Sequence, residues 1–329
     1  MARPAAFLAV RFFYSYYDIL NRKEGILPMA GSTLETTKSL GWASRFEAQW
    51  EDIRRTLRRL RKSFLSILGL FLVLGLIFMA VFADHLAPYP EDTAGVHFDR
   101  SFAAPSTEHP FGCDEVGRDV LSRVIFGARI SLVMGTAVLA IAIGVGVPLG
   151  LIAGYAGGMA GIVIMRVTDI FLSIPPLVLA MAVSAILPPT IQNSIIAISF
   201  GWWPWYTRLV QGMVLSLKED LYVEAGRSFG AGTFYMVFKE ILPNLVAVLI
   251  VKATLDMGYA ILVGAELGFL GLGVSPPTPE WGIMASEGRS LLPEKWWVTT
   301  FSGLAIFTTV MAFNLLGDGL RDAFDVELE

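Results

Sequence analysis

The sequence has little cysteine, little charge and no phosphate-binding loop. Cys113 is the only cysteine among 329 residues, which excludes an internal disulfide and a Cys-rich metal site. Only 16% of the residues are charged, less than the surface of a soluble domain of this size needs. The net charge of −4 argues against a nucleic-acid partner. No segment reads Gly-x-x-x-x-Gly-Lys-Ser/Thr, and the Gly-rich run 268–273 has no following lysine, so no ATP site is predicted.

Apolar residues are abundant, at 54% of the chain, and they fall in long runs. A bilayer core about 30 Å thick is crossed by roughly 20 apolar residues in a helix, which satisfies its own backbone polar groups. Six runs meet this length, which predicts an all-α polytopic membrane protein with about six transmembrane helices. The runs are Phe64–Phe82, Ile130–Tyr155, Ile162–Leu187, Ser194–Leu215, Leu245–Leu267 and Thr299–Leu316. The fourth is the weakest, because aromatic residues, a proline and Arg208 crowd its later half.

Basic residues predict the orientation. Twelve Lys or Arg residues precede the first run, six of them in segment 54–62, next to Phe64. The positive-inside rule then places the N-terminus in the cytoplasm, and six spans return the C-terminus there. Segments 84–129 and 268–298 are therefore predicted to be external, and 216–244 internal. Segment 84–129 also carries four arginines, but the N-terminal cluster is denser and closer to a span.

The predicted organisation has five parts. Residues 1–62 form a cytoplasmic amphipathic and basic segment, 63–83 the first transmembrane helix and 84–129 an external loop. Residues 130–320 form a core of five helices that includes a cytoplasmic loop, 216–243, and residues 321–329 form a cytoplasmic tail. The aromatic-rich start of the chain is expected to lie on the inner leaflet as a membrane anchor, with a docking arm for a partner subunit as the alternative. No signal peptide is expected, because the first apolar stretch contains Arg11 and no small-residue cleavage site follows.

The most informative stretch is the internal loop from Tyr222 to Pro243, YVEAGRSFGAGTFYMVFKEILP. It predicts a short helix, a turn that Gly230 permits, and a second short helix that Pro243 ends where the next span begins. A helix–turn–helix between two spans gives a rigid knob, which can transmit the movement of a partner into the neighbouring helices.

This loop resembles the signature loop of ABC importer permeases, in which Glu-Ala-Ala is followed at fixed spacing by Gly and Leu-Pro. Gly226 stands where the second alanine is usual, and Glu240 where isoleucine is usual. Other motifs resemble the dipeptide/oligopeptide/nickel permeases, and within them the second, C-type permease of the pair. They are His109–Asp114, Gly117–Arg123, Gly127–Leu132, Pro148–Gly150, Gly154–Gly158, Phe269–Gly273 with Pro276-Pro277 and Trp281-Gly282, and Asn314–Asp322. The resemblance covers roughly residues 60–325.

The resemblance implies a type I ABC importer permease fold in a prokaryotic inner or plasma membrane. The implied partners are a homologous permease, two cytoplasmic ATPase subunits, an external substrate-binding protein and membrane lipid. The chain would bind no cofactor, with ATP and Mg²⁺ held by the ATPases. The implied ATPase-docking residues are Glu224, Ala225, Gly226, Gly230, Leu242 and Pro243. Short peptides are the first expected cargo, and nickel chelate, glutathione or an oligosaccharide are the alternatives.

Six charged residues fall within predicted spans, where each costs roughly 2.5–3.5 kcal/mol on insertion scales, and four of them form two closely spaced sets. Arg166 and Asp169 lie three positions apart in the third span, and Lys252 and Asp256 four apart in the fifth. Each set is a candidate for the translocation pathway. The alternatives are a local ion pair or a snorkelling arginine for the first set, and a self-neutralising pair for the second. A proton relay in an ion-coupled secondary transporter would use the same charges.

The remaining polar residues are expected to have ordinary roles. The loop carboxylates Asp84, Asp114, Glu115, Asp119 and Glu280 are expected to be solvated, with contact to a binding protein as the alternative, and the three histidines to be loop residues without a metal. The Pro175-Pro176 pair is expected to bend the third span. No nucleophile–base set has usable spacing, which argues against an enzyme. A receptor or scaffold would explain the spans but not the loop at Glu224.

Overall fold

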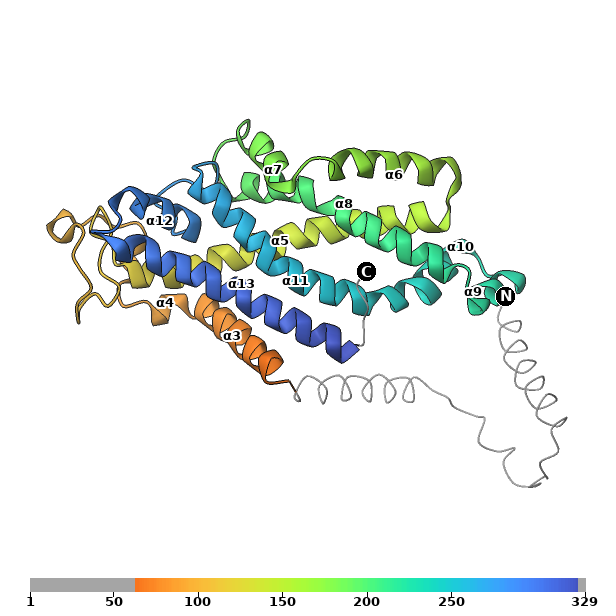
Figure 1. Ribbon diagram of the computed structural model, residues 1–329, viewed down its shortest axis with the longest axis horizontal. Helices are drawn as coiled ribbons and strands as arrows, with labels where there is room; N and C mark the ends of the chain where they lie inside the picture. Colours follow the sequence, from red (N-terminus) through yellow and green to blue (C-terminus); the bar gives the residue numbers. More distant parts are fainter. Residues whose placement is uncertain (1–62, 325–329) are drawn as a thin grey trace, which may run out of the picture. The chain divides into compact units, whose positions relative to one another are not determined.

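A computed structural model describes residues 63–324, and they are helical and irregular without a strand (Figure 1). The predictions for residues 1–62 and for the last five residues lie outside the described part. The chain divides into two compact units, and each is described by itself. Within the described residues, the smaller unit is Ser216–Asn244 and the larger one comprises 63–215 and 245–324.

The helices of the larger unit follow the order of the predicted spans. They are α3 (Phe64–Val81), α4 (Ala83–Leu86), α5 (Val120–Tyr155), α6 (Gly158–Leu172), α7 (Pro176–Ser184), α8 (Ile191–Leu217), α11 (Leu242–Phe269), α12 (Trp281–Gly288) and α13 (Trp296–Phe324), with short 3-10 turns η2 (Pro90–Thr93), η3 (Phe98–Arg100) and η5 (Arg289–Leu291). Helix α13 continues beyond residue 320, where the tail was predicted to begin.

The described residues contain four helices long and apolar enough to cross a membrane: α3, α5, Thr233–Phe269 and α13. A fifth span is obtained if α6 and α7 are counted together. The remaining predicted span, the fourth in sequence order, corresponds to α8, which has 27 residues. Helix α8 is not among the helices apolar enough to cross a membrane by composition, because aromatic and polar residues lower its mean hydropathy. The same residues made this run the weakest in the sequence.

Helix α5 begins earlier than the apolar run that predicted it. Asp119 caps its N-terminus, accepting a hydrogen bond from the backbone N–H of Ser122 at 2.7 Å. Positions 120–129, predicted as part of a loop, are therefore helical. The physical signal was present in the sequence, since an aspartate before an amphipathic run favours a helix start.

The predicted bend in the third span is confirmed. Helices α6 and α7 meet at 84° around Pro175 and Pro176. Pro176 begins α7, where the missing backbone N–H costs nothing, and Pro175 restricts Ile174 to a non-helical conformation.

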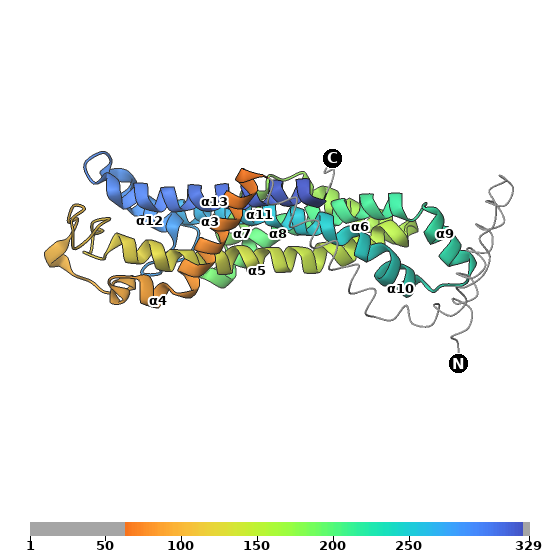
Figure 2. The ribbon, with the colours of Figure 1, turned by 90° about the horizontal axis from the view of Figure 1, so that it is seen from below.

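Two apolar cores hold the larger unit together. Helix α3 packs along α13, as Figures 1 and 2 both show, and these two helices share one core with α5 and α12. The second core joins α5, α7, α8 and α11.

Three glycines on α5 allow α8 to approach closely. A Cβ added at Gly146, Gly150 or Gly154 would lie 2.6–2.7 Å from atoms of α8. This spacing of four residues is typical of small-residue contacts between membrane helices.

Candidate functional site

The loop that carries the predicted docking residues forms the smaller unit. It contains α9 (Leu221–Ser228), the single turn α10 (Thr233–Tyr235) and a π-helical segment, η4 (Met236–Ile241). Val223, Met236 and Ile241 are fully buried. These buried residues make the unit a packed helix–turn–helix, which confirms the predicted first helix and the turn at Gly230.

Gly230 closes α9 with a left-handed turn. Its φ is +79°, and the backbone N–H of Ala231 donates to the carbonyl of Gly226 at 3.0 Å, while that of Gly230 donates to Arg227. This is the pattern of a Schellman C-cap, in which glycine avoids the Cβ penalty of the left-handed region. The glycine of the motif is therefore required by the turn itself.

The departure at Gly226 has a packing reason. A Cβ added there would lie 2.8 Å from the sulfur and 3.0 Å from the methyl carbon of Met236. Met236 is fully buried. The absent methyl group at position 226 is thus matched by a long side chain at 236, which fills the space between the two helices.

Glu224 lies in the first turn of α9 and is exposed. It forms no ion pair within the described residues, and its charge is favourable near the positive end of the helix. Large apolar side chains of the same unit are also exposed: Leu221 (82%), Phe229 (62%), Phe234 (75%), Tyr235 (53%) and Phe238 (46%). An unpaired carboxylate among exposed aromatic residues is a surface suited to a protein partner.

The prediction for Pro243 is wrong. The π-helical segment runs directly into α11, and Pro243 is the second residue of that helix, so it does not end one. The wider π turn accommodates a residue that has no backbone N–H for the preceding turn. Leu242 is half-buried and Pro243 is exposed.

Of the charges in the spans, Lys252 and Asp256 pair within α11, with Nζ 2.6 Å from Oδ1. The predicted pairing is confirmed. Asp256 is buried, and its other oxygen, Oδ2, has no hydrogen-bond partner among the described residues. The hydroxyl of Tyr206 on α8 is also buried without such a partner, and it lies within electrostatic range of the Asp256 carboxylate.

Asp169 does not pair with Arg166. Its carboxylate pairs with Arg208, which joins α6 to α8, and both side chains are about half exposed. Arg166 is exposed on α6. The sequence could not show this partner, because it depends on how α6 lies against α8.

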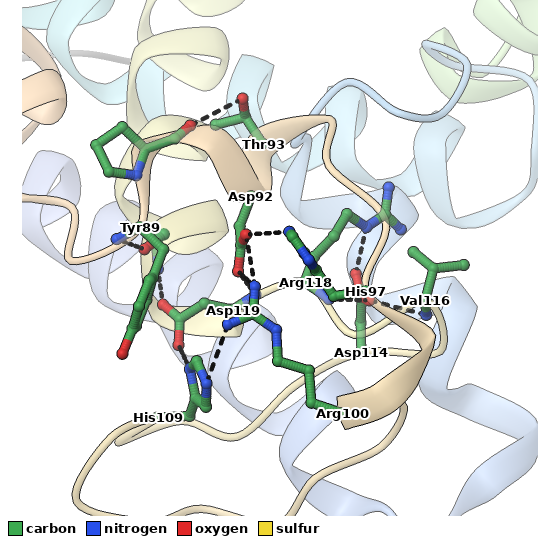
Figure 3. A network of polar contacts seen from close by, with 12 residues as sticks. Tyr89, Asp92, Thr93, His97, Arg100, His109, Asp114, Val116, Arg118 and Asp119 are labelled. Atoms are coloured by element: carbon green, nitrogen blue, oxygen red, sulfur yellow. Dashed lines mark hydrogen bonds and ion pairs between the residues drawn. The ribbon is translucent and has the colours of Figure 1, made fainter.

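A network of buried charges lies in the segment before α5, where sequence reasoning expected solvated side chains (Figure 3). Asp92 is fully buried; both its oxygens accept from Arg100 Nη2 at 2.9 Å, and Oδ2 also accepts from the backbone N–H of Asp119. Nδ1 of His109 lies 2.9 Å from the carboxylate of Asp119. The other Asp119 oxygen accepts from the backbone N–H of Ser122, so every carboxylate oxygen of Asp92 and Asp119 has a partner.

The second half of the network surrounds Asp114. Its Oδ2 accepts from Arg118 Nε at 2.7 Å and from Arg123 Nη1 at 2.5 Å, and Arg123 also reaches Glu287 on α12 at 3.1 Å. Asp114 and Arg123 are each 1% exposed. The loop is therefore tied to both α5 and α12 by paired charges.

The expectation of solvated loop carboxylates is wrong for Asp114, Asp119 and Glu280, which are buried. It is right for Asp84 and Glu115. The three buried residues have opposite charges or backbone donors around them, which offsets the cost of removing them from water.

Two other features of this region bear on chemistry. No group of three or more His, Cys, Asp or Glu side chains could hold a metal ion within residues 63–324. Cys113 is buried, and its burial raises the pKa of the thiol to about 11. The thiol is therefore unreactive at neutral pH.

Glu280 caps α12, and its two oxygens accept from the backbone N–H groups of Gly282 and Ile283 at 2.9 Å. It is 1% exposed and lies outside the candidate spans. Burial raises the pKa of this carboxyl to about 7, although the two hydrogen bonds oppose the change. Between its ordinary pKa of 4.5 and this raised pKa, the Glu280 carboxyl is therefore protonated in the folded chain and ionised in the unfolded chain.

We expect Glu280 to make the folded state less stable as the pH rises. Between its ordinary pKa of 4.5 and its folded pKa of about 7, the folded state binds more protons, so stability falls across this window by at most roughly 3 kcal/mol. The thermal unfolding temperature of the purified permease should therefore fall between pH 5 and pH 7. In Glu280→Gln this decrease should be reduced, and an identical pH profile in both proteins would contradict the assignment.

The helices, the bent span and the packed loop form the fold of a type I ABC importer permease. A structural comparison supports this fold. The permease of the MetNI methionine ABC transporter, in inward-facing crystal forms, superposes with a TM-score of 0.52 at 20% identity and covers 61% of this chain and 95% of that chain. At this identity the likeness shows the fold alone, and it is the fold predicted from the sequence.

The chain belongs to the family of binding-protein-dependent transport system inner membrane components, which matches residues 146–328. Residues 49–105 match the N-terminal transmembrane domain of oligopeptide transport permease C. The predicted C-type permease of peptide ABC importers is therefore confirmed.

Curated relatives share much of the sequence. The di/tripeptide transport system permease protein DppC of Pseudomonas aeruginosa is 46% identical, over 79% of this chain and 88% of the relative. The dipeptide permease DppC of Escherichia coli K12 is 47% identical, over 80% and 89%. The glutathione transport system permease protein GsiD of Pectobacterium atrosepticum is 42% identical, over 85% and 92%.

Proposed function

We propose that this chain and a homologous permease form the translocation pathway of an ATP-driven importer, which receives short peptides from an external binding protein. The family supports the transport role, and the relatives named for di- and tripeptide transport support the cargo. Glutathione is the second candidate, because GsiD is 42% identical.

The proposed orientation places both termini and the loop 216–243 in the cytoplasm. The arginines of segment 84–129 weighed against this orientation in the sequence. In the structure all four are paired with carboxylates: Arg100 with Asp92, Arg118 and Arg123 with Asp114, and Arg129 with Asp84. These paired arginines are fewer and less densely clustered than the basic residues that precede Phe64, which supports the N-in orientation.

The single observation that carries the proposal is the exposed knob at Glu224. A packed unit with a left-handed turn at Gly230 presents the Glu224 carboxylate and several apolar side chains to a partner. In the proposal this partner is one of the two cytoplasmic ATPase subunits of the importer. Docking there couples the closure of the ATPase pair to movement of the spans, and hydrolysis takes place on those subunits.

The proposal predicts uptake driven by ATP and not by an ion gradient. Proteoliposomes that contain both permeases and the ATPase pair should accumulate labelled dialanine when the binding protein is outside and ATP is inside. Uptake should persist with an uncoupler and stop when ATP is replaced by ADP. The reverse pattern would show an ion-coupled secondary transporter, and uptake of glutathione without dialanine would replace the proposed cargo.

A further inference from the structure

Helix α11 carries polar residues along a face that the rest of this chain leaves partly open. Lys252, Tyr259 and Glu266 are spaced by seven residues, so they share one face, and none of them is buried. The opposite face contributes Ile261 to the first core, whereas Ala260, Val263 and Leu267 pack into the second core on and beside the polar face. A face with Lys and Glu at membrane depth is unsuited to lipid and is expected to line a protein-enclosed or water-filled path.

Asp256 stands at the edge of this face, and only one of its two carboxylate oxygens has a hydrogen-bond partner among the described residues. Lys252 Nζ lies 2.6 Å from Oδ1, whereas Oδ2 has no hydrogen-bond partner among the described residues. From the buried side, the Tyr206 hydroxyl lies within electrostatic range of the carboxylate. The exposed fractions of the side chains are 28% for Lys252 and 8% for Asp256. The lysine therefore covers a carboxylate that is itself almost fully buried.

The lysine has the same chemistry as part of a peptide. Its –NH₃⁺ group and the α-ammonium group of a peptide are both primary ammonium ions, with three donors and one positive charge. A position that holds Nζ at 2.6 Å also fits an α-ammonium group. Tyr259, about one turn further along α11, is 49% exposed and packs against the buried Trp202 with ring centroids 5.2 Å apart, so its ring offers apolar surface to a peptide side chain.

We propose that Asp256 receives the ammonium group of the cargo and that Lys252 occupies this position until the cargo arrives. This inference rests on the proposed import of peptides. When the cargo replaces Lys252, the carboxylate remains paired and the released lysine turns toward the carboxylate of the peptide. No buried charge is left without a counter-charge at either stage, which avoids the cost of an unpaired ion. The site thus selects cargo with a free primary ammonium group.

The test measures binding to the complete nucleotide-free importer in detergent, without the binding protein. The probes are radiolabelled dialanine and N-acetyl-dialanine, and the measurement is equilibrium dialysis. The unaltered complex should bind dialanine about tenfold more tightly, as expected for a hydrogen bond to a charged group. Asp256→Asn should abolish this preference and Tyr206→Phe should reduce it, whereas Lys252→Met should retain it. Asp169→Asn, which removes another intramembrane carboxylate, should leave it unchanged.

Three results would overturn the inference: no binding of either peptide, equal binding of both by the unaltered complex, or an unchanged preference in Asp256→Asn. A merely structural role for Asp256 would weaken both peptides equally. The proposed function has its own readout, the ATP-driven uptake of dialanine. Uptake with an unchanged preference in Asp256→Asn would reject this site and keep the importer.

Discussion

Glu224→Lys should uncouple the permease from its ATPase subunits while leaving the permease folded. The side chain is exposed and forms no ion pair within the described residues, so its replacement removes nothing from the core. The reversed charge disfavours the first turn of α9 by only about 0.3–1 kcal/mol. At a docking surface, by contrast, a central residue contributes enough to reduce ATPase co-purification by about thirtyfold. Transport-coupled hydrolysis should fall with it.

Glu219→Lys is the matched control. Glu219 is also exposed and belongs to the same unit, but it precedes α9 and lies outside the motif. It should leave co-purification within about twofold of the unaltered protein, as expected for a peripheral charge. Equal losses in both variants would indicate a general charge effect. Normal co-purification and hydrolysis in Glu224→Lys, and also in Glu224→Ala, would show that the docking assignment is wrong.

Asp114→Ala should prevent stable folding of the segment before α5. It removes the carboxylate that pairs with Arg118 and Arg123, and both guanidinium groups are almost fully buried. Leaving buried cations without this partner should cost about 3–5 kcal/mol. We expect a large fall in the thermal unfolding temperature of the purified permease and in the yield of assembled complex.

A double-mutant cycle separates the ion pair from a general packing effect. Asp114→Ala/Arg123→Met should lose less stability than the sum of its single variants, because it removes both charges together. Glu115→Ala is the control, since this neighbouring carboxylate is exposed. Additive losses in the cycle, or an unchanged unfolding temperature in Asp114→Ala, would contradict the structural role of the network.

The sequence predicted those features of the fold that depend on local patterns. The length of the apolar runs located the spans, Pro175 and Pro176 located the bend, and Gly230 located the turn. The i,i+4 spacing also predicted the pair of Lys252 with Asp256, because a helix fixes that distance by itself. Each of these depends on residues close together in the chain.

The sequence could not predict features that depend on contacts between distant segments. Arg118 and Arg123 both link Asp114 to Glu287, which lies far away in the sequence, and Asp169 meets Arg208 only because α6 lies beside α8. Asp114, Asp119 and Glu280 are buried although they were expected to be solvated. A polar stretch can either face water or be enclosed together with its hydrogen-bond partners, and the sequence does not distinguish the two. Tyr206 could not be predicted as a neighbour of Asp256, because the two residues lie on different helices, α8 and α11. The available signal in the sequence was an aspartate in an apolar span with a single lysine four residues away, which suggests that another polar group lies near it.

Site-specific cross-linking from position 224 tests the central claim most directly. Cys113 gives little background, because it is buried and its pKa of about 11 keeps the thiol protonated. In the assembled importer, Glu224→Cys treated with a short heterobifunctional cross-linker should form a permease–ATPase product, and Glu219→Cys should form much less. Cross-links from position 224 only to lipid or to the external binding protein would contradict a cytoplasmic docking loop.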